Sequence, residues 1–416
     1  MTVDARAAAP AIVAGGVGIA PLLTLGAVAT LGPLGTDAFL PALPDMGRDL
    51  DVAAATVQLT LSAYTVGMAA GQLVAGPLSD MVGRRLPLRA GLSLMAVGAW
   101  SAAFSVDATM LVACCAAMGV GASFSTVTGR AVISDRVDRA RLARTYAMLG
   151  TLTSLGPILG PLAGVALSSV WGWRSIFITL GLLAAACLVS CIVGIPESLR
   201  RSSRDTAALR ALPRRVGRAL RSRAYARGAT VIWFGFGGMF AYVASSSFLL
   251  QETLGMSGLT YAGAYALNGI ALICAGLLSA RLLRRLRPQV VMALGLAVES
   301  TGALLMVVAL VSGAITPALV LPALTLIACS MGFLFGPAMA YGLRDLRDAA
   351  GTALGLLGTV QFLIAGIVAA IAASGTVVVS FTATVTVSLV IAWSGWLLFR
   401  DPPARRDVSA ETTVHA

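Results

Sequence analysis

The chain has 416 residues, of which 58% are hydrophobic and 12% are charged, and its mean hydropathy is +0.88. A soluble domain carries about 25% charged residues, and a soluble fold of this length could not bury so much apolar surface, so the composition excludes an ordinary soluble protein. The formal net charge of +12 calls for no nucleic-acid partner, because the basic residues follow a membrane topology.

Apolar runs long enough to cross about 30 Å of hydrocarbon as helices recur along the whole chain. They are too long, and too continuously apolar, to be strands of a membrane barrel. We place twelve spans at residues 17–41, 54–78, 86–105, 109–134, 142–168, 173–195, 229–251, 259–282, 289–312, 316–341, 351–373 and 376–399. Residues 1–16 lack the pattern of a cleavable signal peptide, so the first span is expected to direct its own insertion.

The basic residues gather on one side of these spans. All 30 are arginines, and 27 of them lie on one side if both termini share that side. The other side holds Arg48 and Arg174, and Arg130 lies near the end of the fourth span. Basic residues mark cytoplasmic loops. We therefore expect both termini in the cytoplasm of a bacterial cell, in a multi-pass protein of the inner membrane that also contacts anionic lipid head groups.

The spans divide into two halves. Residues 196–228 (PESLRRSSRDTAALRALPRRVGRALRSRAYARG) form the only long polar segment between spans, with six spans before it and six after. The stretch GPLSDMVGRR at 76–85 is echoed by GLLSARLLRR at 276–285, in the same place of the second half. We expect an N-terminal bundle (1–195), a basic linker (196–228), a C-terminal bundle (229–400) and a tail (401–416). Two related six-helix bundles are typical of a transporter.

The sequence offers little for catalysis. The six cysteines lie inside expected spans without CxxC spacing, and the single histidine is His415, so we expect neither a metal site nor a disulfide framework. No nucleotide-binding glycine loop or Walker motif is present, so we expect no cofactor, no built-in ATP motor and no enzyme.

Several motifs resemble one family. GPLSDMVGRR resembles the signature between the second and third helices of the major facilitator superfamily, and the chain resembles that fold from end to end. Three further stretches resemble its drug/proton antiporters, in the bicyclomycin and chloramphenicol resistance branch. They are LGPLGTDAFLPALPDMGRDL (31–50), AGTALGLLGTVQF (350–362) and, in the fifth span, GPILGPLAG (156–164).

The resemblance implies a cytoplasmic latch between the second and third spans. Asp80 is expected to face the N-terminus of the eleventh span, where the helix dipole favours a carboxylate by roughly 0.3–1 kcal/mol. The family pattern implies that Arg84 pairs with Asp135, while Gly76 and Gly83 allow close packing and a tight turn. Alternatively, these charges only mark topology. The expected latch residues are Gly76, Asp80, Gly83, Arg84, Arg85, Arg130 and Asp135.

Two acidic residues lie inside expected spans, where charges are costly and usually functional. Asp37 lies in the outer part of the first span, between Pro33 and Pro41. The resemblance implies that it takes part in protonation and substrate sensing; alternatively it is a helix-end acid facing water. Glu299 lies about 15 Å into the ninth span, and no family motif places it. It could be a second proton site, a buried hydrogen-bond partner or an acid facing the transport pathway.

The fifth span carries the motif associated with exporters. We expect its small residues to let this span approach a helix of the other half closely, although generic small-residue packing would look the same. The motif residues are Gly156, Pro157, Gly160, Pro161 and Gly164.

In the fourth span the sequence departs from the antiporter pattern, because Cys115 stands where the family usually has an arginine. Coupling therefore works without that arginine or is altered.

The substrate cavity is expected between the first, second, fourth and fifth helices of each half. Large apolar rings with a few hydrogen-bonding groups suit a medium-sized amphipathic drug, although each residue could instead be packing or lipid-facing. The candidates are Tyr64, Phe240, Asn268 and Gln361.

We therefore predict a monomeric, proton-coupled exporter of small amphipathic compounds, chloramphenicol-like compounds first, that works by alternating access in a lipid bilayer. The alternative is an exporter or importer of an endogenous metabolite or a sugar with the same fold. Whether neighbouring genes encode a biosynthetic pathway or a drug-responsive repressor would discriminate between the two.

Overall fold

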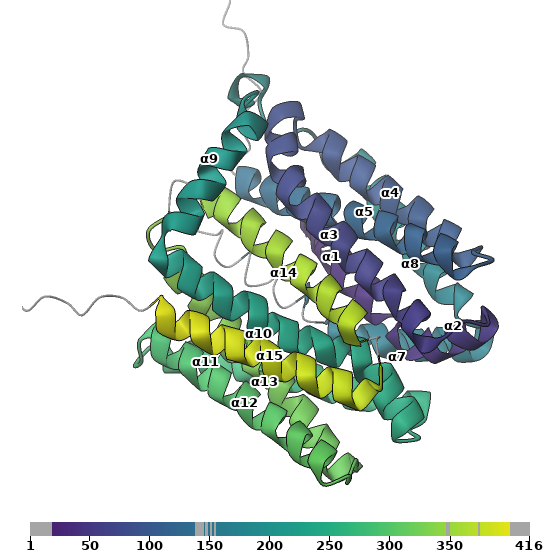
Figure 1. Cartoon of the computed structure of the whole chain (residues 1–416). Coiled ribbons are helices and arrows are strands. Elements are labelled where there is room, and N and C mark those ends of the chain that lie inside the picture. The colour runs from purple at the N-terminus through teal and green to yellow at the C-terminus, as the bar shows by residue number, and fades with distance from the viewer. Residues whose placement is uncertain are drawn as a thin grey trace, which may run out of the picture.

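The computed structural model describes residues 19–137, 145, 149, 152–153, 155–346, 350–372 and 375–399. All regular structure within these ranges is helical (Figure 1). The expected tail (401–416) and much of the first part of the fifth span lie outside the described residues.

The described helices follow the expected spans closely. The first half contains α1 (Ile19–Asp37), η1 (Leu40–Ala42), α2 (Leu43–Asp49), α3 (Ala54–Val82), α4 (Arg85–Ala103), α5 (Ala108–Arg136), α7 (Gly156–Trp171) and α8 (Arg174–Gly194). The second half contains α10 (Arg223–Ser247), η3 (Phe248–Thr253), α11 (Gly258–Leu282), α12 (Pro288–Val311), α13 (Pro317–Gly342), α14 (Ala350–Ala372) and α15 (Val377–Leu398). The largest difference is at α10, which begins at Arg223 inside the segment expected to be linker.

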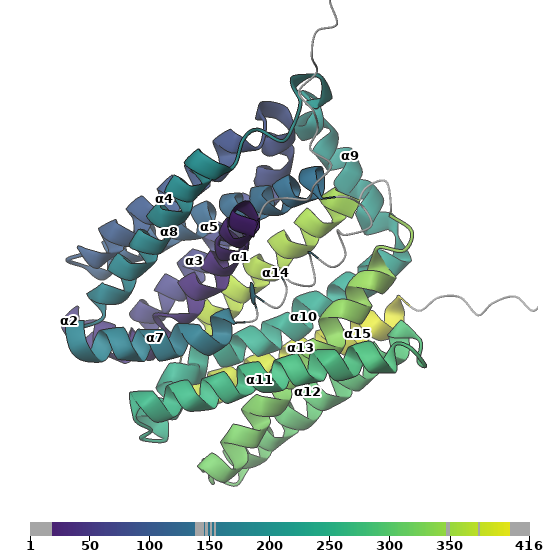
Figure 2. The same ribbon diagram turned by 180° about the vertical axis from the view of Figure 1, so that it is seen from behind.

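Two six-helix bundles make up the molecule. Helices α1, α3, α4, α5, α7 and α8 form one, and α10 to α15 form the other (Figures 1 and 2). Within the described ranges, nine helical segments are long and apolar enough to cross a membrane by composition alone. The other three members are α3 and α4, which are less apolar, and α7, of which 16 residues are described.

The outer helices present apolar side chains outward. Val193 on α8 is 83% exposed, and Leu304 on α12 and Val390 on α15 are also exposed. An apolar surface this large on a soluble monomer would be a liability. In a bilayer it contacts lipid, which agrees with the membrane assignment.

Local signals set the helix ends that matter here. The α-helix of α1 ends at Asp37, and the chain continues through η1 and α2 instead of extending the helix. Gly172, with φ of +76°, ends α7, a conformation that glycine adopts without a steric penalty. Asp107 accepts a hydrogen bond from the Met110 backbone N–H at 2.8 Å and so caps α5.

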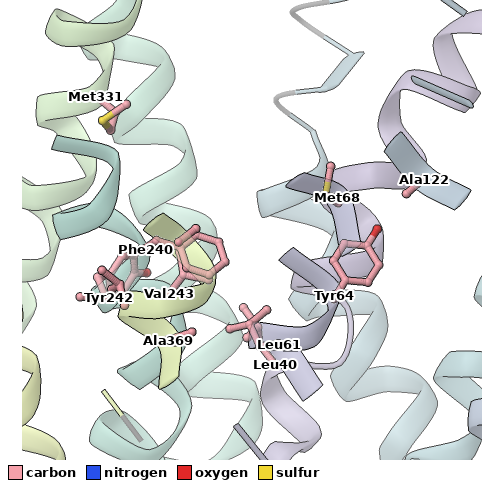
Figure 3. Close-up of a cluster of buried hydrophobic side chains, with 14 of the residues drawn as sticks. Leu40, Leu61, Tyr64, Met68, Ala122, Phe240, Tyr242, Val243, Met331 and Ala369 are labelled. Carbon is pink, nitrogen blue, oxygen red and sulfur yellow. The ribbon is translucent and has the colours of Figure 1, made fainter. Parts of the chain in front are cut away.

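The two bundles meet along α3 and α14 and along α7 and α11. We call these two contacts between the bundles the seam. Between α3 and α14, Gly358 lets the helices approach closely, since a Cβ on Gly358 would lie 2.9 Å from Oε1 of Gln72 on α3. Figure 3 shows Leu40 and Leu61 of the first half and Phe240 of the second, which belong to one cluster of buried hydrophobic side chains. Two amides also cross the seam, from Gln58 to the Ala244 carbonyl (3.2 Å) and from Gln251 to the Pro41 carbonyl (3.0 Å).

A short amphipathic helix, α9 (Ala208–Arg221), joins the bundles. It crosses the ends of the membrane helices (Figure 1) and packs against α3, α14 and α10. We call this end of the molecule, which holds Arg84 and α9, the basic end. The end that holds Asp37 and Gln251 is called the opposite end.

Candidate functional site

Asp37 lies at the contact between the two bundles, near the opposite end. Its carboxyl is buried, with 5% of the residue exposed. The Tyr265 hydroxyl on α11 donates to Asp37 Oδ1 at 3.3 Å. The Thr36 hydroxyl donates to the Pro33 carbonyl at 2.8 Å and lies 3.3 Å from the same Asp37 oxygen. The first of these bonds joins α1 of one half to α11 of the other. A helix-end acid facing water does not fit this position.

Tyr265 belongs to a group of aromatic and polar side chains in the second half. Its ring stacks on Tyr242 at 5.5 Å between centroids and lies 5.9 Å from Tyr261. Asn268 donates to the Tyr242 hydroxyl at 3.0 Å and accepts from Thr325 at 2.7 Å. The group therefore connects Asp37 to α10, α11 and α13.

The glycines of the fifth span pack against α1, not against the other half as expected. A Cβ on Gly160 would lie 3.0 Å from Asp37 Cβ, one on Gly156 would lie 2.7 Å from Pro33 Cβ, and one on Gly164 would collide with the Ala38 carbonyl oxygen. The small-residue face therefore brings α7 against the segment that carries Asp37. Pro157 and Pro161 lie in the first two turns of the described helix.

The close approach to the other half has a different origin. There, α11 supplies the small residue and α7 supplies the branched side chain. A Cβ on Gly269 would lie 2.9 Å from Ile158, and one on Gly258 would lie 3.6 Å from Val165. The expected contact between the fifth span and the second half exists, but the sequence motif is not what makes it.

At the basic end, Arg84 lies at the centre of a charge cluster. Its Nη1 contacts Asp80 Oδ1 at 2.5 Å, and its Nε contacts Asp135 Oδ2 at 3.0 Å. Nη1 also donates to the Ser79 hydroxyl at 2.6 Å. The pairing of Arg84 with Asp135 is as expected. Asp80 pairs with an arginine of its own half, and its approach to the N-terminus of α14 stays a prediction.

The linker adds residues that the sequence pattern did not single out. Glu197 accepts hydrogen bonds from the backbone N–H groups of Arg84 (2.8 Å) and Arg85 (3.2 Å), at the start of α4. Partial burial raises the pKa of Glu197, but these N–H groups, with that of Leu199, outweigh it and hold the pKa below its ordinary value. The Asp205 N–H donates to the Asp80 carbonyl at 3.1 Å. The linker is thus attached to the loop between α3 and α4.

The other expected latch residues have different environments. Gly83 has φ of +99°, and a Cβ there would lie 2.6 Å from Glu197 Oε2, so this turn requires glycine. A Cβ on Gly76 would meet no described residue within 4 Å, so the part of the chain that the structure describes does not show the expected close packing at Gly76. Arg85 meets Glu197 through its backbone, and Arg130 is an exposed residue of α5.

A cavity of about 550 Å³ opens in the second half. It is lined by residues of α10, α11 and α13, toward the basic end, including Phe236, Met239, Ile273, Met331 and Phe335. Among the described residues that line it, Ser279 has the only polar side-chain group. Such walls accept rings and hydrocarbon chains.

None of the four expected cavity residues lines this space. Tyr64 is fully buried and donates to the Gly32 carbonyl at 3.0 Å, and Asn268 is held in the tyrosine group. Phe240 is the nearest, since its ring lies 5.6 Å from that of Phe236, which lines the cavity. Gln361 is buried on α14. A polar side chain in an apolar span needs a hydrogen-bond partner, but that partner need not be a substrate. Tyr64 and Asn268 each bond to a residue of their own half.

Comparison with known proteins decides the family. A family model described as the Major Facilitator Superfamily matches residues 23–370. The chain belongs to the major facilitator superfamily. A crystal structure of a D-xylose–proton symporter matches with a TM-score of 0.67 at 16% identity, covering 89% of this chain and 97% of that one. This likeness confirms the fold of twelve spanning helices in two bundles, and shows nothing about the cargo.

Curated relatives of this transporter carry drug-resistance names. The bicyclomycin resistance protein homolog of Haemophilus influenzae (strain ATCC 51907 / DSM 11121 / KW20 / Rd) is 27% identical over 85% of this chain and 88% of its own length. Multidrug resistance protein D of Escherichia coli (strain K12) is 29% identical over 58% of this chain and 60% of its own length. The uncharacterized MFS-type transporter YdgK of Bacillus subtilis (strain 168) is 32% identical over 60% of this chain and 62% of its own length. The chain thus matches less than two thirds of the length of the last two. These relatives confirm the resemblance to the drug-resistance branch of the superfamily.

Proposed function

We propose that this transporter exports small amphipathic compounds in exchange for protons, with chloramphenicol-like compounds as the first candidates. The names of the relatives, which include bicyclomycin and multidrug resistance proteins, support drug export. The nearly wholly apolar lining of the cavity favours an amphipathic cargo over a sugar, which needs many hydrogen-bonding groups. In this proposal the chain works as a monomer, and its basic end faces the cytoplasm of a bacterial cell.

The observation that carries the proposal is the position of Asp37. Closing the opposite end buries its carboxyl between α1, α7 and α11. Burying a neutral acid costs far less free energy than burying a carboxylate. A proton arriving from outside therefore favours the closed opposite end found in this structure, and loss of the proton favours opening it. Substrate that enters from the cytoplasm promotes proton release, and so couples export to proton entry.

The charge cluster at the basic end takes the complementary role. Arg84, Asp80 and Asp135 are paired within one half here, while the opposite end is closed. In the other state we place Asp80 at the N-terminus of α14, where the helix dipole favours a carboxylate. Asp80 would thus exchange partners between the two states, which makes the cluster a latch.

Drug susceptibility of an efflux-deficient host tests the proposal. Cells that express the wild-type transporter are expected to resist chloramphenicol or another amphipathic drug. With Asp37→Asn, which keeps the shape but cannot exchange a proton, resistance is expected to fall to within about twofold of the empty vector. Asp51→Asn is the matched control, because Asp51 is an exposed acid at the same end, and its φ of +50° suits asparagine. Immunoblots must show equal expression. Full resistance with Asp37→Asn would remove Asp37 from coupling, and no resistance with the wild type would reject drug export.

A further inference from the structure

Arg227 is a buried charge that the proposed mechanism does not use. It lies one turn into α10, at the basic end, and only 4% of the residue is exposed. Arginines that mark a cytoplasmic loop normally face water or head groups, as the exposed Arg223 does one turn earlier on the same helix. A guanidinium does not lose its proton in a protein, and burying an unpaired charge is costly. Topology alone therefore does not explain Arg227.

No described carboxylate pairs with Arg227. Its Nε is buried without a hydrogen-bond partner among the described residues, and the ion pairs found in that part of the chain do not include it. Glu299 on α12 is fully buried in the same half, but it meets α10 at Gly235 and Gly238. Gly235 lies roughly 12 Å further along the helix than Arg227, so the two charges do not meet. Glu299 as a second proton site stays a prediction.

Two aromatic rings hold the guanidinium instead. The Arg227 Cζ lies 4.6 Å from the centroid of the Trp396 ring on α15 and 5.7 Å from that of the Tyr341 ring on α13. The faces of such rings attract a cation. They do not supply the acceptor oxygens that the N–H groups along the edge of a guanidinium need. The site therefore lacks a partner that brings negative charge and oxygen atoms together.

Close helix packing fixes the backbone on both sides of the guanidinium. Helix α10 packs against α13 and α15, and it lies beside α15 in Figure 1. A Cβ on Gly228, next to Arg227, would lie 2.5 Å from the Ala338 carbonyl oxygen of α13. A Cβ on Gly395, next to Trp396, would collide with Thr230 of α10. The positions of the arginine and of the rings are therefore set by the fold.

The surroundings match the depth of lipid head groups. Tyr341 and Trp396 lie near the ends of α13 and α15 at the basic end, and tyrosine and tryptophan are enriched where a membrane meets water. A second guanidinium, that of Arg344, lies 4.4 Å from the Tyr341 centroid and pairs with Asp345 at the surface. Helix α15 also presents exposed apolar side chains such as Val390 to the surrounding lipid.

We propose that Arg227 binds the phosphate of an anionic phospholipid in the leaflet at the basic end, with Arg344 beside it and Trp396 and Tyr341 as the aromatic wall. The planar guanidinium matches phosphate oxygens, which it binds through two parallel hydrogen bonds. Basic pockets between membrane helices are known to take such head groups. The bound lipid supplies the missing counter-charge and holds the ends of α10, α13 and α15 together. This site is separate from the proposed export function and does not depend on the cargo.

Lipid binding to the purified, full-length transporter in detergent tests the site. The probes are dioleoylphosphatidylglycerol, which is anionic, and dioleoylphosphatidylcholine, whose phosphate is balanced by its own cation. Arg227→Gln is expected to weaken phosphatidylglycerol binding, counted by native mass spectrometry, by about tenfold or more, because charge-assisted hydrogen bonds are lost. Phosphatidylcholine binding is expected to stay within about twofold. Arg223→Gln is the matched control, since it removes the same charge from an exposed residue one turn away, and it is expected to change neither affinity.

A measurement with Arg227 intact covers the case in which Arg227→Gln does not fold. Lipids with brominated chains quench tryptophans that they contact, and Trp396→Phe identifies the share of the fluorescence that comes from Trp396. Brominated phosphatidylglycerol is expected to quench this share at about one tenth of the concentration that brominated phosphatidylcholine needs.

Several outcomes would overturn the lipid site. They are equal quenching of Trp396 by both lipids, unchanged phosphatidylglycerol affinity in Arg227→Gln, and equal weakening by Arg227→Gln and Arg223→Gln, which would reflect overall charge. Inorganic phosphate that displaces phosphatidylglycerol at equal concentration would make this a site for the free ion. Selective binding that appears only after Asp401→Asn would assign Arg227 to a carboxylate of the tail, which lies outside the described residues.

Discussion

At the scale of residues, one hydrogen bond joins Asp37 to the other half of the molecule. The Tyr265 hydroxyl is the donor that reaches Asp37 from the second half. A hydrogen bond to a charged group contributes more free energy than one to a neutral group, about 1.5–3 against 0.5–1.5 kcal/mol. This bond therefore offsets part of the free energy that burying the Asp37 carboxylate costs, but the desolvation cost is larger, so protonation of Asp37 still favours the closed end.

Tyr265→Phe removes this donor and keeps the ring. Resistance is expected to fall, and its dependence on external pH to change, because the buried Asp37 carboxylate loses its donor from the second half and becomes more costly to bury. The shift in the equilibrium between closed and open states is expected to be about tenfold. Tyr261→Phe is the control one turn away, since the Tyr261 hydroxyl bonds to Ser246 and not to Asp37. Resistance is measured at several values of external pH. The same pH dependence in Tyr265→Phe and Tyr261→Phe would contradict a specific role for the Tyr265 hydroxyl.

Glu197 should attach the linker in a pH-dependent way. Its pKa is lower in the folded protein than the ordinary value of 4.5. The stabilisation is therefore present above pH 4.5 and is lost as the pH falls through the lower, folded value. Glu197→Gln is expected to cost about 1 kcal/mol locally, which reduces amide protection at Arg84 and Arg85 roughly fivefold at neutral pH. Hydrogen exchange, corrected for intrinsic rates, measures this. Equal protection in the variant and the wild type would mean that Glu197 does not hold the linker.

At the scale of elements, the fifth span shows how a motif can be found while its partner is misplaced. Glycine spacing in GPILGPLAG predicts one face of α7 without bulky side chains, and that face exists. Periodicity does not say which neighbouring helix the face meets, because α1 and α11 both lie beside α7. The structure assigns the glycines to α1 and the branched residues Ile158 and Val165 to α11.

Gly164→Ala should be damaging, since the added Cβ has no room beside the Ala38 carbonyl oxygen. Overpacking of this kind costs about 1–3 kcal/mol, and here it displaces the segment that carries Asp37. A lower melting temperature in detergent and lower resistance are expected. Gly76→Ala is the control, because a Cβ at Gly76 would meet none of the described residues within 4 Å. If Gly76→Ala lowered the melting temperature and the resistance while Gly164→Ala lowered neither, tight packing at Gly164 would be contradicted.

The sequence predicted the elements better than the contacts between them. Most helix ends lie within a few residues of the expected spans, because hydropathy and glycine or proline at the ends are local signals. Nothing in the sequence sets Tyr265 apart from the other aromatic residues of these spans, because its pairing with Asp37 depends on a contact across 228 residues of sequence. Glu197 looked like one acid in a basic linker. Only the fold brings it to the start of α4.

At the scale of the whole molecule, the structure holds one arrangement of the two halves. The opposite end is closed by Asp37, Gln58 and Gln251, whose side chains reach across the seam. The apolar cavity lies toward the basic end. Its walls could not be predicted from residue type, because aromatic and aliphatic residues occur on every face of these helices. Alternating access requires a second arrangement in which the opposite end opens.

Spin labels at Val170 on α7 and Leu259 on α11 would report that opening. Both residues are exposed, lie at the opposite end and belong to different halves. In a background without the six cysteines, the distance between the labels is expected to be short at acidic pH and longer at alkaline pH, because protonated Asp37 favours closure. A control pair at Val170 and Val106, both in the first half, should not change. The same response in both pairs, or in neither, would contradict rigid movement of the halves.

Coupling of proton and drug movement through Asp37 can be measured in proteoliposomes. The purified transporter is reconstituted with a pH-sensitive dye inside, and a chloramphenicol gradient is imposed at equal pH on both sides. For the wild type, we expect proton movement opposite to the drug, abolished by a protonophore. For Asp37→Asn at equal incorporation, we expect no drug-driven proton movement. Drug-driven proton movement that persists in Asp37→Asn would contradict the account, since protons would then cross by a path that Asp37 does not control.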